Sequence, residues 1–226
     1  MSDTVAVLGG TGALGKALAA RLARAGYPVV LGSRDAARAQ EAATEVAGKV
    51  GGEARIDGTA NDDAATAGDI VLLATPWDAS GESIAALADA LAGRLVVSCI
   101  NPLGFDARGP HGLAVPEGSA AEQVAGLLPA STVTAAFHHL SAPSLAKLDK
   151  DLSGEDVLVC GDDAAARARV VALAEAVTGR PGIDVGALRQ ARVLEPFTAV
   201  LIAVNKRYKT RAGVLLTHVD PGRPSA

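Results

Sequence analysis

A glycine-rich turn, Gly9-Gly10-Thr11-Gly12-Ala13-Leu14-Gly15, follows the first apolar run, Val5–Leu8, and opens a helical pattern. Its last six residues satisfy the pattern G-x-G-x-x-G. In such a turn one glycine permits the tight bend, the next lets backbone amides approach a pyrophosphate, and the last lets the helix pack closely on the strand. The first helical turn adds unpaired N–H groups and a positive dipole end. We therefore predict a dinucleotide site held by Gly10, Thr11, Gly12, Ala13 and Leu14.

Short β-branched runs alternate with alanine-rich stretches of helical period along most of the chain. This alternation is typical of βαβ units and predicts an α/β fold of Rossmann type, with a mainly parallel, doubly wound sheet. The expected strands are Val5–Leu8, Val29–Leu31, Ile70–Ala74, Leu95–Cys99, Val133–Phe137 and Val157–Cys160. The expected helices are Leu14–Ala25, Ala36–Val50, Ala60–Ala67, Ser83–Leu91, Ala120–Leu128 and Ala164–Thr178. After about Leu140 the alternation loosens.

The composition describes an acidic chain rich in apolar residues. Among 226 residues, 21 Lys and Arg stand against 25 Asp and Glu, a formal net charge of −4, and 49% of the residues are hydrophobic. Such a chain buries a sizeable core and is not disordered. The sequence pI of about 5.6 argues against a nucleic-acid or membrane-surface protein, because both need a basic footprint. No apolar run approaches the ~18 residues that span a bilayer.

The start of the chain and its cysteines bear on the compartment. Met1-Ser2-Asp3-Thr4 lacks the basic segment that opens a secretory signal, so we expect a cytoplasmic protein. Cys99 and Cys160 lie in separate apolar runs, without a C-x-x-C or a His/Cys metal spacing. We interpret both as buried thiols.

The end of the second predicted strand distinguishes NAD from NADP, because an NAD enzyme presents a carboxylate there to the ribose 2′-hydroxyl. This chain instead has Ser33 and Arg34, a hydroxyl and a guanidinium that suit a 2′-phosphate, and Arg38 adds a second cation one helical turn later. Asp35 falls past the strand and is typical of a helix cap. We predict NADP; the alternatives are that Arg34 is an ordinary exposed arginine and that Asp35 is the ribose-binding acid.

Loops that follow parallel strands meet at the carboxyl edge of the sheet, where ligands bind. Here they are mostly apolar: Thr75-Pro76-Trp77, Ile100-Asn101-Pro102-Leu103-Gly104-Phe105 and His138-His139-Leu140-Ser141-Ala142-Pro143. Such a wall suits hydride transfer, in which two ring carbons are held about 3–3.5 Å apart with water excluded. No metal or nucleophile is needed for that reaction.

Three aromatic side chains in these loops have alternative interpretations. Trp77 is either a core residue with its N–H satisfied or a contact of the cofactor ring. Of His138 and His139, one is expected to hydrogen-bond the acceptor ring and the other to pack. No carboxylate or cysteine accompanies the two histidines, so we do not predict a metal.

A final helical block runs from Leu188 to Tyr208 and contains Pro196. Proline lacks a backbone donor, so we expect a kinked helix, or two helices with Pro196 near the start of the second. One face carries an apolar stripe, which is either core packing or a dimer face: Val193, Leu194, Phe197, Leu201 and Val204.

The same block ends in a basic cluster. Its cations are either favourably placed at a helix C-terminus or form a dock for an anionic tail of a second substrate. They are Lys206, Arg207, Lys209 and Arg211.

Together these motifs resemble the NADPH-dependent reductases of the deazaflavin coenzyme F420, over nearly the whole chain. The first two motifs are common to many dinucleotide enzymes, whereas the later ones are more specific and look most like the bacterial branch. The resemblance is carried by Gly9–Gly12 with Gly15, Gly32–Arg34, Pro76-Trp77, Asn101–Asp106, Gly118–Gln123, Ala135–Ala142 and Asn205–Lys209. The chain departs from the family at Pro196, where relatives generally carry serine, and at Ala79, where histidine or glycine is common.

The resemblance implies reversible hydride transfer between NADPH and coenzyme F420 in a homodimer. It implies a Rossmann domain over residues 1–142 and a small α-rich domain over residues 143–226 that completes the deazaflavin site. It places NADP against Thr11–Leu14, Ser33, Arg34 and Arg38. The stacked rings would be surrounded by Thr75, Pro76, Trp77, Asn101, Pro102, His138, Leu140 and Ser141.

Two other functions remain as alternatives. An imine or hydroxyacid reductase shares the N-terminal fold, but the chain after Leu140 is too short for the long helical domain of those enzymes. A short-chain dehydrogenase is disfavoured, because Ala212 stands four residues after Tyr208 where that class needs lysine. A non-catalytic NADP sensor would use the same glycine-rich turn.

Overall fold

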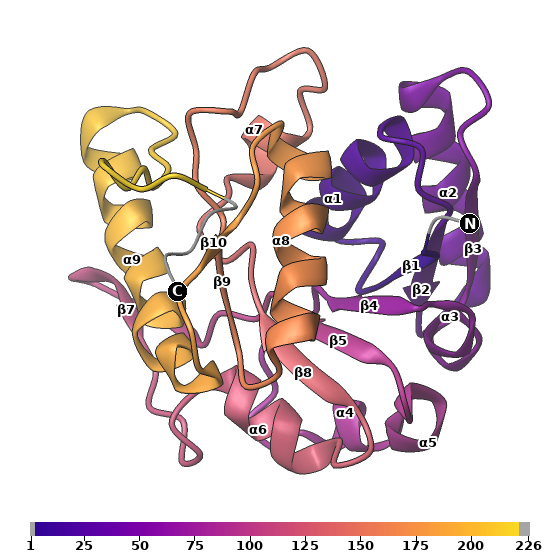
Figure 1. Ribbon diagram of the computed structural model, residues 1–226, viewed down its shortest axis with the longest axis horizontal. Helices are drawn as coiled ribbons and strands as arrows, with labels where there is room; N and C mark the ends of the chain where they lie inside the picture. Colours follow the sequence, from indigo (N-terminus) through magenta and orange to yellow (C-terminus); the bar gives the residue numbers. More distant parts are fainter. Residues whose placement is uncertain (1–2, 222–226) are drawn as a thin grey trace.

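The computed structural model describes residues 3–221, so Met1, Ser2 and the last five residues lie outside the described part. A central sheet carries helices on both faces, with α1 and α8 on one side and α4 to α6 on the other (Figure 1). This architecture confirms the predicted α/β class.

Eight of the described strands form one sheet in the order β10-β9-β8-β5-β4-β1-β2-β3. Neighbouring strands are parallel except for β8 and β9, which pair antiparallel with Ala135 opposite Cys160. The strand order reverses between β1 and β4, which makes the point where a Rossmann sheet binds its ligand. The strands are β1 (Val5–Leu8), β2 (Val29–Ser33), β3 (Ile56–Ala60), β4 (Ile70–Leu73), β5 (Leu95–Ser98), β8 (Thr132–Ala135), β9 (Leu158–Gly161) and β10 (Ile183–Asp184).

Three of the described helices, α2, α6 and α8, begin at a polar cap, and α2, α3 and α8 end at glycine. Asp35, Ser119 and Asp163 each accept a backbone N–H bond at the start of a helix, and Gly179 ends α8 in the left-handed conformation. The helices are α1 (Ala13–Arg24), α2 (Ala36–Val50), α3 (Asn61–Ala67), α4 (Glu82–Ala85), α5 (Ala88–Leu91), α6 (Ala120–Leu127), α7 (Ala142–Leu145), α8 (Ala164–Thr178), the 3-10 turn η1 (Leu188–Gln190) and α9 (Ala191–Tyr208).

Two apolar cores lie on the two faces of the sheet because side chains alternate along each strand. In β1, Val5 and Val7 join the core under α1, α2 and α8, whereas Ala6 and Leu8 join the core under α3 and α6. All four residues of β1 are buried, which is typical of a parallel strand covered on both sides.

Several elements differ from the sequence prediction. The predicted helix Ser83–Leu91 is split into α4 and α5, and the edge strands β3 and β10 were not predicted. The segment after Pro102, expected to be a loop, forms a hairpin of β6 (Leu103–Asp106) and β7 (Gly109–Gly112) that packs on α9. A single helix, α9, runs through Pro196 after η1, so of the two alternatives the division into two helices at Pro196 was wrong.

The chain beyond residue 142 adds to the same sheet instead of standing apart from it. β9 pairs with β8, β10 pairs with β9, and α8, η1 and α9 follow in sequence. The boundary between two domains at residue 142 stays a prediction. Within residues 3–221 no helix is long and apolar enough to cross a membrane.

Candidate active site

The glycine-rich turn is shaped by close backbone contacts that only glycine allows. Gly9 has φ +79°, and a Cβ built there would lie 2.7 Å from the carbonyl oxygen of Ala74. A Cβ on Gly15 would lie 2.5 Å from the carbonyl oxygen of Gly9. The turn therefore packs closely against Ala74, at the start of the loop after β4, and the start of α1 packs closely against the turn.

The first turn of α1 is left open at its N-terminus. Its N-cap residue is Gly12, which has no side chain to accept an N–H bond, whereas α2, α6 and α8 are capped by Asp35, Ser119 and Asp163. Thr11, Gly12 and Ala13 are exposed beside it. Unpaired amides and a positive dipole end form a ready site for a phosphate.

Ser33 ends β2 and is half-buried, while Arg34 and Arg38 are exposed on the chain that follows. The Asp35 carboxylate accepts bonds from the backbone N–H groups of Ala37 at 2.9 Å and Arg38 at 3.3 Å. This confirms the prediction that Asp35 caps α2. The helix engages Oδ1 of this carboxylate. The hydroxyl of Ser33 and the guanidinium groups of Arg34 and Arg38 lie at the same end of β2 and suit a phosphate.

The loop after β4 carries the half-buried Trp77, which packs against the α6-side core. Its indole Nε1 donates to Oε1 of Gln123 at 3.0 Å, and Nε2 of Gln123 donates to the carbonyl oxygen of Ala79 at 3.1 Å. Gln123 therefore fixes both the indole and the loop that bears it. Thr75 is half-buried and Pro76 is exposed in the same loop.

The loops after β5 and β8 are joined through α9. Nδ2 of Asn101 donates to the carbonyl oxygen of His138 at 3.2 Å. The Thr198 hydroxyl lies 3.1 Å from the same oxygen and 3.3 Å from Oδ1 of Asn101. Thr198 thus holds the Asn101 amide in one orientation. Pro102, next along the chain, is buried.

The two adjacent histidines have different surroundings. His139 Nε2 lies 2.8 Å from the carbonyl oxygen of Leu194, and its ring meets Phe197 edge-on at 5.4 Å between centroids. His138 is 4% exposed, and neither ring nitrogen has a hydrogen-bond partner in the described part of the chain. Burial, together with the neighbouring His139, lowers the pKa of His138 to about 3, so its ring is neutral.

The backbone at this loop is strained. Phe137, directly before the histidines, has φ +66° although it carries a large buried side chain. A non-glycine residue in that region costs on the order of 1–3 kcal/mol and is often found at ligand sites. Leu140, three residues after Phe137, is buried, and the half-buried Ser141 precedes α7.

A buried carboxylate ties α9 to the sheet edge. Glu195 is 1% exposed and accepts bonds from the backbone N–H groups of Ala120 at 2.8 Å and Ala121 at 2.9 Å, at the start of α6. Burial raises its pKa to about 7, although the two N–H bonds act in the opposite direction. This contact fixes the position of α9 along its axis, and so the position at which Thr198 and Leu194 contact the loop after β8.

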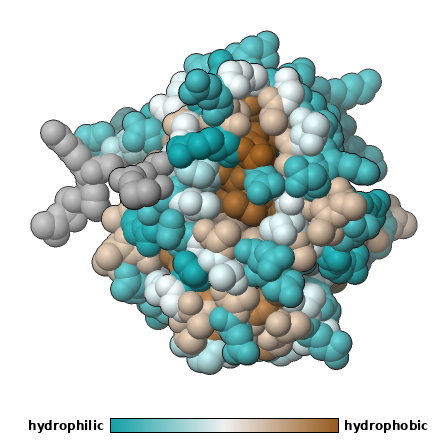
Figure 2. All heavy atoms as spheres, turned by 90° about the vertical axis from the view of Figure 1, so that its right-hand side faces the viewer, coloured by the Kyte–Doolittle hydropathy of each residue, from teal (hydrophilic) through white to brown (hydrophobic). Residues whose placement is uncertain are grey.

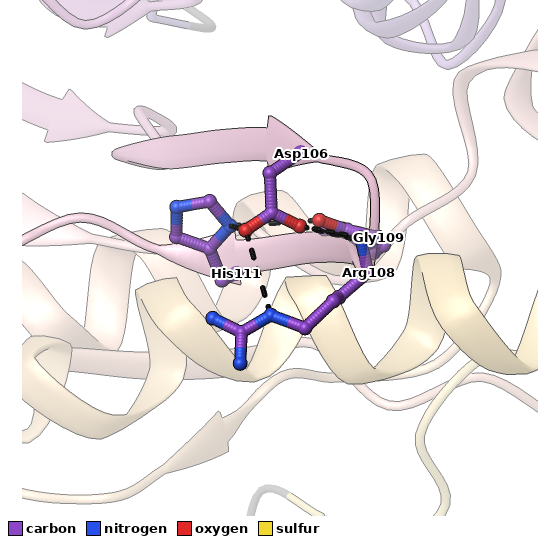
Figure 3. A pocket seen from close by; sticks show the side chains of 5 residues that line it. Asp106, Arg108, Gly109 and His111 are labelled. Carbon is purple, nitrogen blue, oxygen red and sulfur yellow. Dashed lines mark hydrogen bonds and ion pairs between the residues drawn. The ribbon is translucent and has the colours of Figure 1, made fainter.

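A surface hollow at the tip of the hairpin is a separate feature (Figure 3). Oδ1 of Asp106 accepts the backbone N–H bonds of Arg108 and Gly109, and Oδ2 lies 4.0 Å from both Arg108 Nε and His111 Nδ1. The carboxylate therefore serves the turn of the hairpin. Within residues 3–221 no group of three or more His, Cys, Asp or Glu is placed to hold a metal.

Comparison with known proteins agrees with this geometry. The family model described as "NADP oxidoreductase coenzyme F420-dependent" matches residues 4–102. The chain is 37% identical to the F420-dependent NADP reductase of Methanocaldococcus jannaschii, over 96% of this chain and 99% of that protein. It is 35% identical to the enzyme of the same name from Methanothermobacter thermautotrophicus, over 95% of each. The chain belongs to the F420-dependent NADP reductase family.

Solved structures place the fold of this F420-dependent NADP reductase family member in a wider group. A structure from Arthrobacter sp. FB24, named for the same family, superposes with a TM-score of 0.76 at 30% identity, over 93% of this chain and 96% of that one. An imine reductase from Myxococcus stipitatus superposes with a TM-score of 0.60 at 20% identity, over 92% of this chain and 63% of that one. The second likeness shows the shared fold alone.

Most of the candidate residues are brought to one edge of the sheet. The loops after β1, β2, β4, β5 and β8 all open at the carboxyl ends of parallel strands, and Arg38 lies in the first turn of α2. The structure adds residues that sequence reasoning did not assign to this site as supports: Gln123, Leu194, Glu195 and Thr198. Gln123 lies in Gly118–Gln123, one of the stretches that carried the family resemblance. That resemblance was the only feature of the sequence that pointed to Gln123.

Proposed function

We propose that this chain catalyses reversible hydride transfer between NADPH and coenzyme F420. The observation that carries the proposal is the uncapped start of α1 beside the glycine-rich turn, together with a β2 end whose carboxylate is already engaged in capping α2. The open amides suit the pyrophosphate, and Ser33, Arg34 and Arg38 suit a ribose 2′-phosphate.

The side chains at the carboxyl edge fit the demands of the reaction. When bound, the dihydronicotinamide supplies a hydride and the deazaflavin accepts it, so the protein has only to align the rings and exclude water. Trp77, held by Gln123, provides apolar surface. The ring of His138 is neutral, so it places a polar group among these loops without adding a charge. We assign His138 and Trp77 to ring positioning and His139 to holding α9.

A spectrophotometric mixing experiment tests this function. We expect the deazaflavin absorbance band to disappear when NADPH is added to the protein with oxidised coenzyme F420, and to return with excess NADP⁺. Tight binding of NADPH without turnover would instead indicate a sensor, and an absence of NADPH binding would overturn the proposal altogether.

A pair of glycine variants makes the same experiment specific to the turn. Gly15→Ala should abolish turnover, because the added Cβ would press on the carbonyl oxygen of Gly9. Gly48→Ala, in α2, is the matched control, since a Cβ there meets nothing within 4 Å. Circular dichroism of both variants would show whether each is folded.

We further propose that the enzyme works in the cytoplasm as a homodimer paired through α9. Both cysteines are free and buried, which fits a reducing compartment. Val193, Val200 and Phe197 leave an apolar stripe exposed on α9, at 65%, 51% and 39%. A second copy of the same helix presents a matching stripe, as a two-fold interface requires.

A further inference from the structure

The first turn of α6 joins α9 to the loop after β4. On the α9 side, the carboxylate of Glu195 accepts the backbone N–H bonds of Ala120 and Ala121, which lie 75 and 74 residues away in the sequence. The hydroxyl of Ser119 accepts the N–H bond of Glu122 at 3.1 Å. Three of the N–H groups that the start of a helix leaves without a helical partner are therefore engaged, two of them by a different element.

An ion pair reinforces the same joint in the opposite direction. The carboxylate of Glu122, in α6, accepts bonds from Nε and Nη2 of Arg192, in α9, at 2.8 and 2.7 Å. Gly118 leaves space for this pair, because a Cβ there would lie 2.5 Å from Nε of Arg192 and 2.8 Å from Oε2 of Glu122. The Arg192 side chain is 55% exposed, so the pair contributes little by itself. The buried carboxylate of Glu195 is the principal contact of the joint.

On its other side the same turn of α6 holds the loop after β4. Gln123 is 7% exposed, and both ends of its amide are used, by the indole of Trp77 and by the carbonyl oxygen of Ala79. Further along this loop, a Cβ on Gly81 would lie 2.6 Å from Cδ1 of Leu127, so the loop also packs directly on α6. Trp77 is therefore placed by α6, and the start of α6 is placed by α9.

The part of α9 around Glu195 also supports the other loops of the candidate site. The carbonyl oxygen of Leu194, the residue before Glu195, lies 2.8 Å from Nε2 of His139 in the loop after β8. Thr198, three residues after Glu195, contacts the loops after β5 and β8. A displacement of α9 at Glu195 therefore affects both of these loops and, through α6, the loop after β4.

We propose that Glu195 is a positioning residue that places Trp77 through Gln123 on α6, and so aligns the loop after β4 with the loops after β5 and β8. This inference rests on the proposed function. Hydride transfer needs two rings held in a fixed geometry, and a misplacement of about 1 Å costs on the order of 100-fold in rate. The carboxylate of Glu195 is bonded to α6, so its effect on the reaction passes through the two helices.

The fluorescence of Trp77, the sole tryptophan, tests the coupling without any ligand. The measurement is made at pH 8, above the raised pKa of about 7 of Glu195, so that the wild-type carboxylate is ionised and accepts both bonds. In Glu195→Gln an NH2 group, which accepts no hydrogen bond, replaces one of the two oxygens. We expect acrylamide to quench Trp77 about 2-fold more strongly in this variant, because a loosened loop opens more often. Glu175→Gln, exposed on α8, is the matched control and should quench as the wild type does.

A double variant tests the path of the coupling. Gln123→Ala removes the bond to the indole directly and should raise the quenching of Trp77 at least as much as Glu195→Gln does. The double variant should quench no more than Gln123→Ala alone, because Glu195 acts on Trp77 through Gln123. If Glu195→Gln fails to fold by circular dichroism, Glu195→Asp takes its place, since its shorter side chain keeps the charge but does not reach both N–H groups.

Turnover separates a positioning role from a purely structural one. In Glu195→Gln we expect kcat to fall about 10-fold and the Kd for NADPH to stay unchanged, because the start of α1 and the end of β2 lie outside these contacts. Unchanged quenching of Trp77, additive quenching in the double variant, or a loss of NADPH affinity as large as the loss in kcat would overturn the proposal. If Trp77 responds as expected but coenzyme F420 is not reduced by NADPH, the proposed function fails while the placement of Trp77 by Glu195 stands.

Discussion

At the scale of residues, the carboxylate of Asp35 has two interpretations in the sequence, a helix cap and a ribose-binding acid. It lies next to Arg34, at about the position where an NAD enzyme keeps its ribose-binding acid. The structure turns that side chain toward the start of α2, where its Oδ1 accepts two backbone N–H bonds. The guanidinium of Arg34 is left exposed and free of any ion pair in the described residues.

Arg34→Ala should weaken NADPH binding by about 1.5–3 kcal/mol, the usual contribution of a hydrogen bond to a charged group. NADH lacks the 2′-phosphate, so its affinity should hardly change. Equilibrium dialysis of both nucleotides against wild type and variant measures the difference. Equal losses for NADPH and NADH would show that Arg34 does not contact the 2′-phosphate.

At the scale of elements, α9 acts as a brace across the carboxyl edge of the sheet. Glu195 fixes it to the start of α6, the Leu194 carbonyl oxygen meets His139, and Thr198 meets the loops after β5 and β8. In Figure 1 the helix runs along the left side of the molecule, next to β7. Removing one of these contacts should loosen the site without disturbing the turn that precedes α1.

The buried carboxyl of Glu195 makes stability depend on pH. Its pKa is raised from 4.5 to about 7, so between these values the folded chain keeps a proton that the unfolded chain releases. The contribution of Glu195 to the free energy of unfolding is thus complete below pH 4.5 and falls as pH rises toward 7, by up to about 3 kcal/mol. Urea unfolding of wild type and Glu195→Gln from pH 4.5 to 8 should show that this decline is missing in the variant.

The variant comparison is needed because His138 acts with the opposite sign. Its pKa is lowered to about 3, so the unfolded chain binds a proton first as pH falls below 6.5, and its contribution to stability is lost in acid. This effect is common to wild type and Glu195→Gln and cancels in their difference. Parallel pH profiles of the two proteins would show that Glu195 titrates normally.

Local patterns in the sequence were sufficient for the central strands and for the phosphate-binding turn. β1 and β4 are β-branched or leucine-rich and buried on both faces, which makes them visible as apolar runs. β3 contains Asp57 and Gly58 at an edge of the sheet and is only partly buried, so it shows no such run. The supports of the site are separated from their partners by 46 residues for Gln123, 75 for Glu195 and 97 for Thr198, and no local pattern reveals pairs that distant.

At the scale of the whole molecule, part of the exposed apolar surface lies along α9. Val193, Phe197, Val200 and Val204 recur at four, three and four residues, the spacing of a helix-pairing seam. Of the predicted stripe, Leu201 alone is buried. The face on the opposite side of the molecule is mostly hydrophilic, with a narrow apolar strip near its centre (Figure 2). Part of the stripe therefore packs inward, and the exposed part is the face through which the proposed dimer would pair.

A substitution on this stripe should separate the two copies. Val193→Glu/Val200→Glu places like charges across the two-fold contact, so sedimentation equilibrium should give a monomer, against a dimer for wild type. Ala168→Glu/Ala172→Glu on the exposed side of α8 adds the same charge elsewhere and should remain a dimer. A monomeric wild type, or a dimeric stripe variant, would exclude this interface.

Gln123 holds the chain's sole tryptophan, Trp77, in one orientation in the loop after β4. Indole emits near the wavelengths at which reduced nicotinamide absorbs. With the rings placed as proposed above, binding of NADPH should therefore quench the fluorescence of this tryptophan. Intrinsic tryptophan fluorescence should therefore report occupancy of the NADPH site without an attached dye.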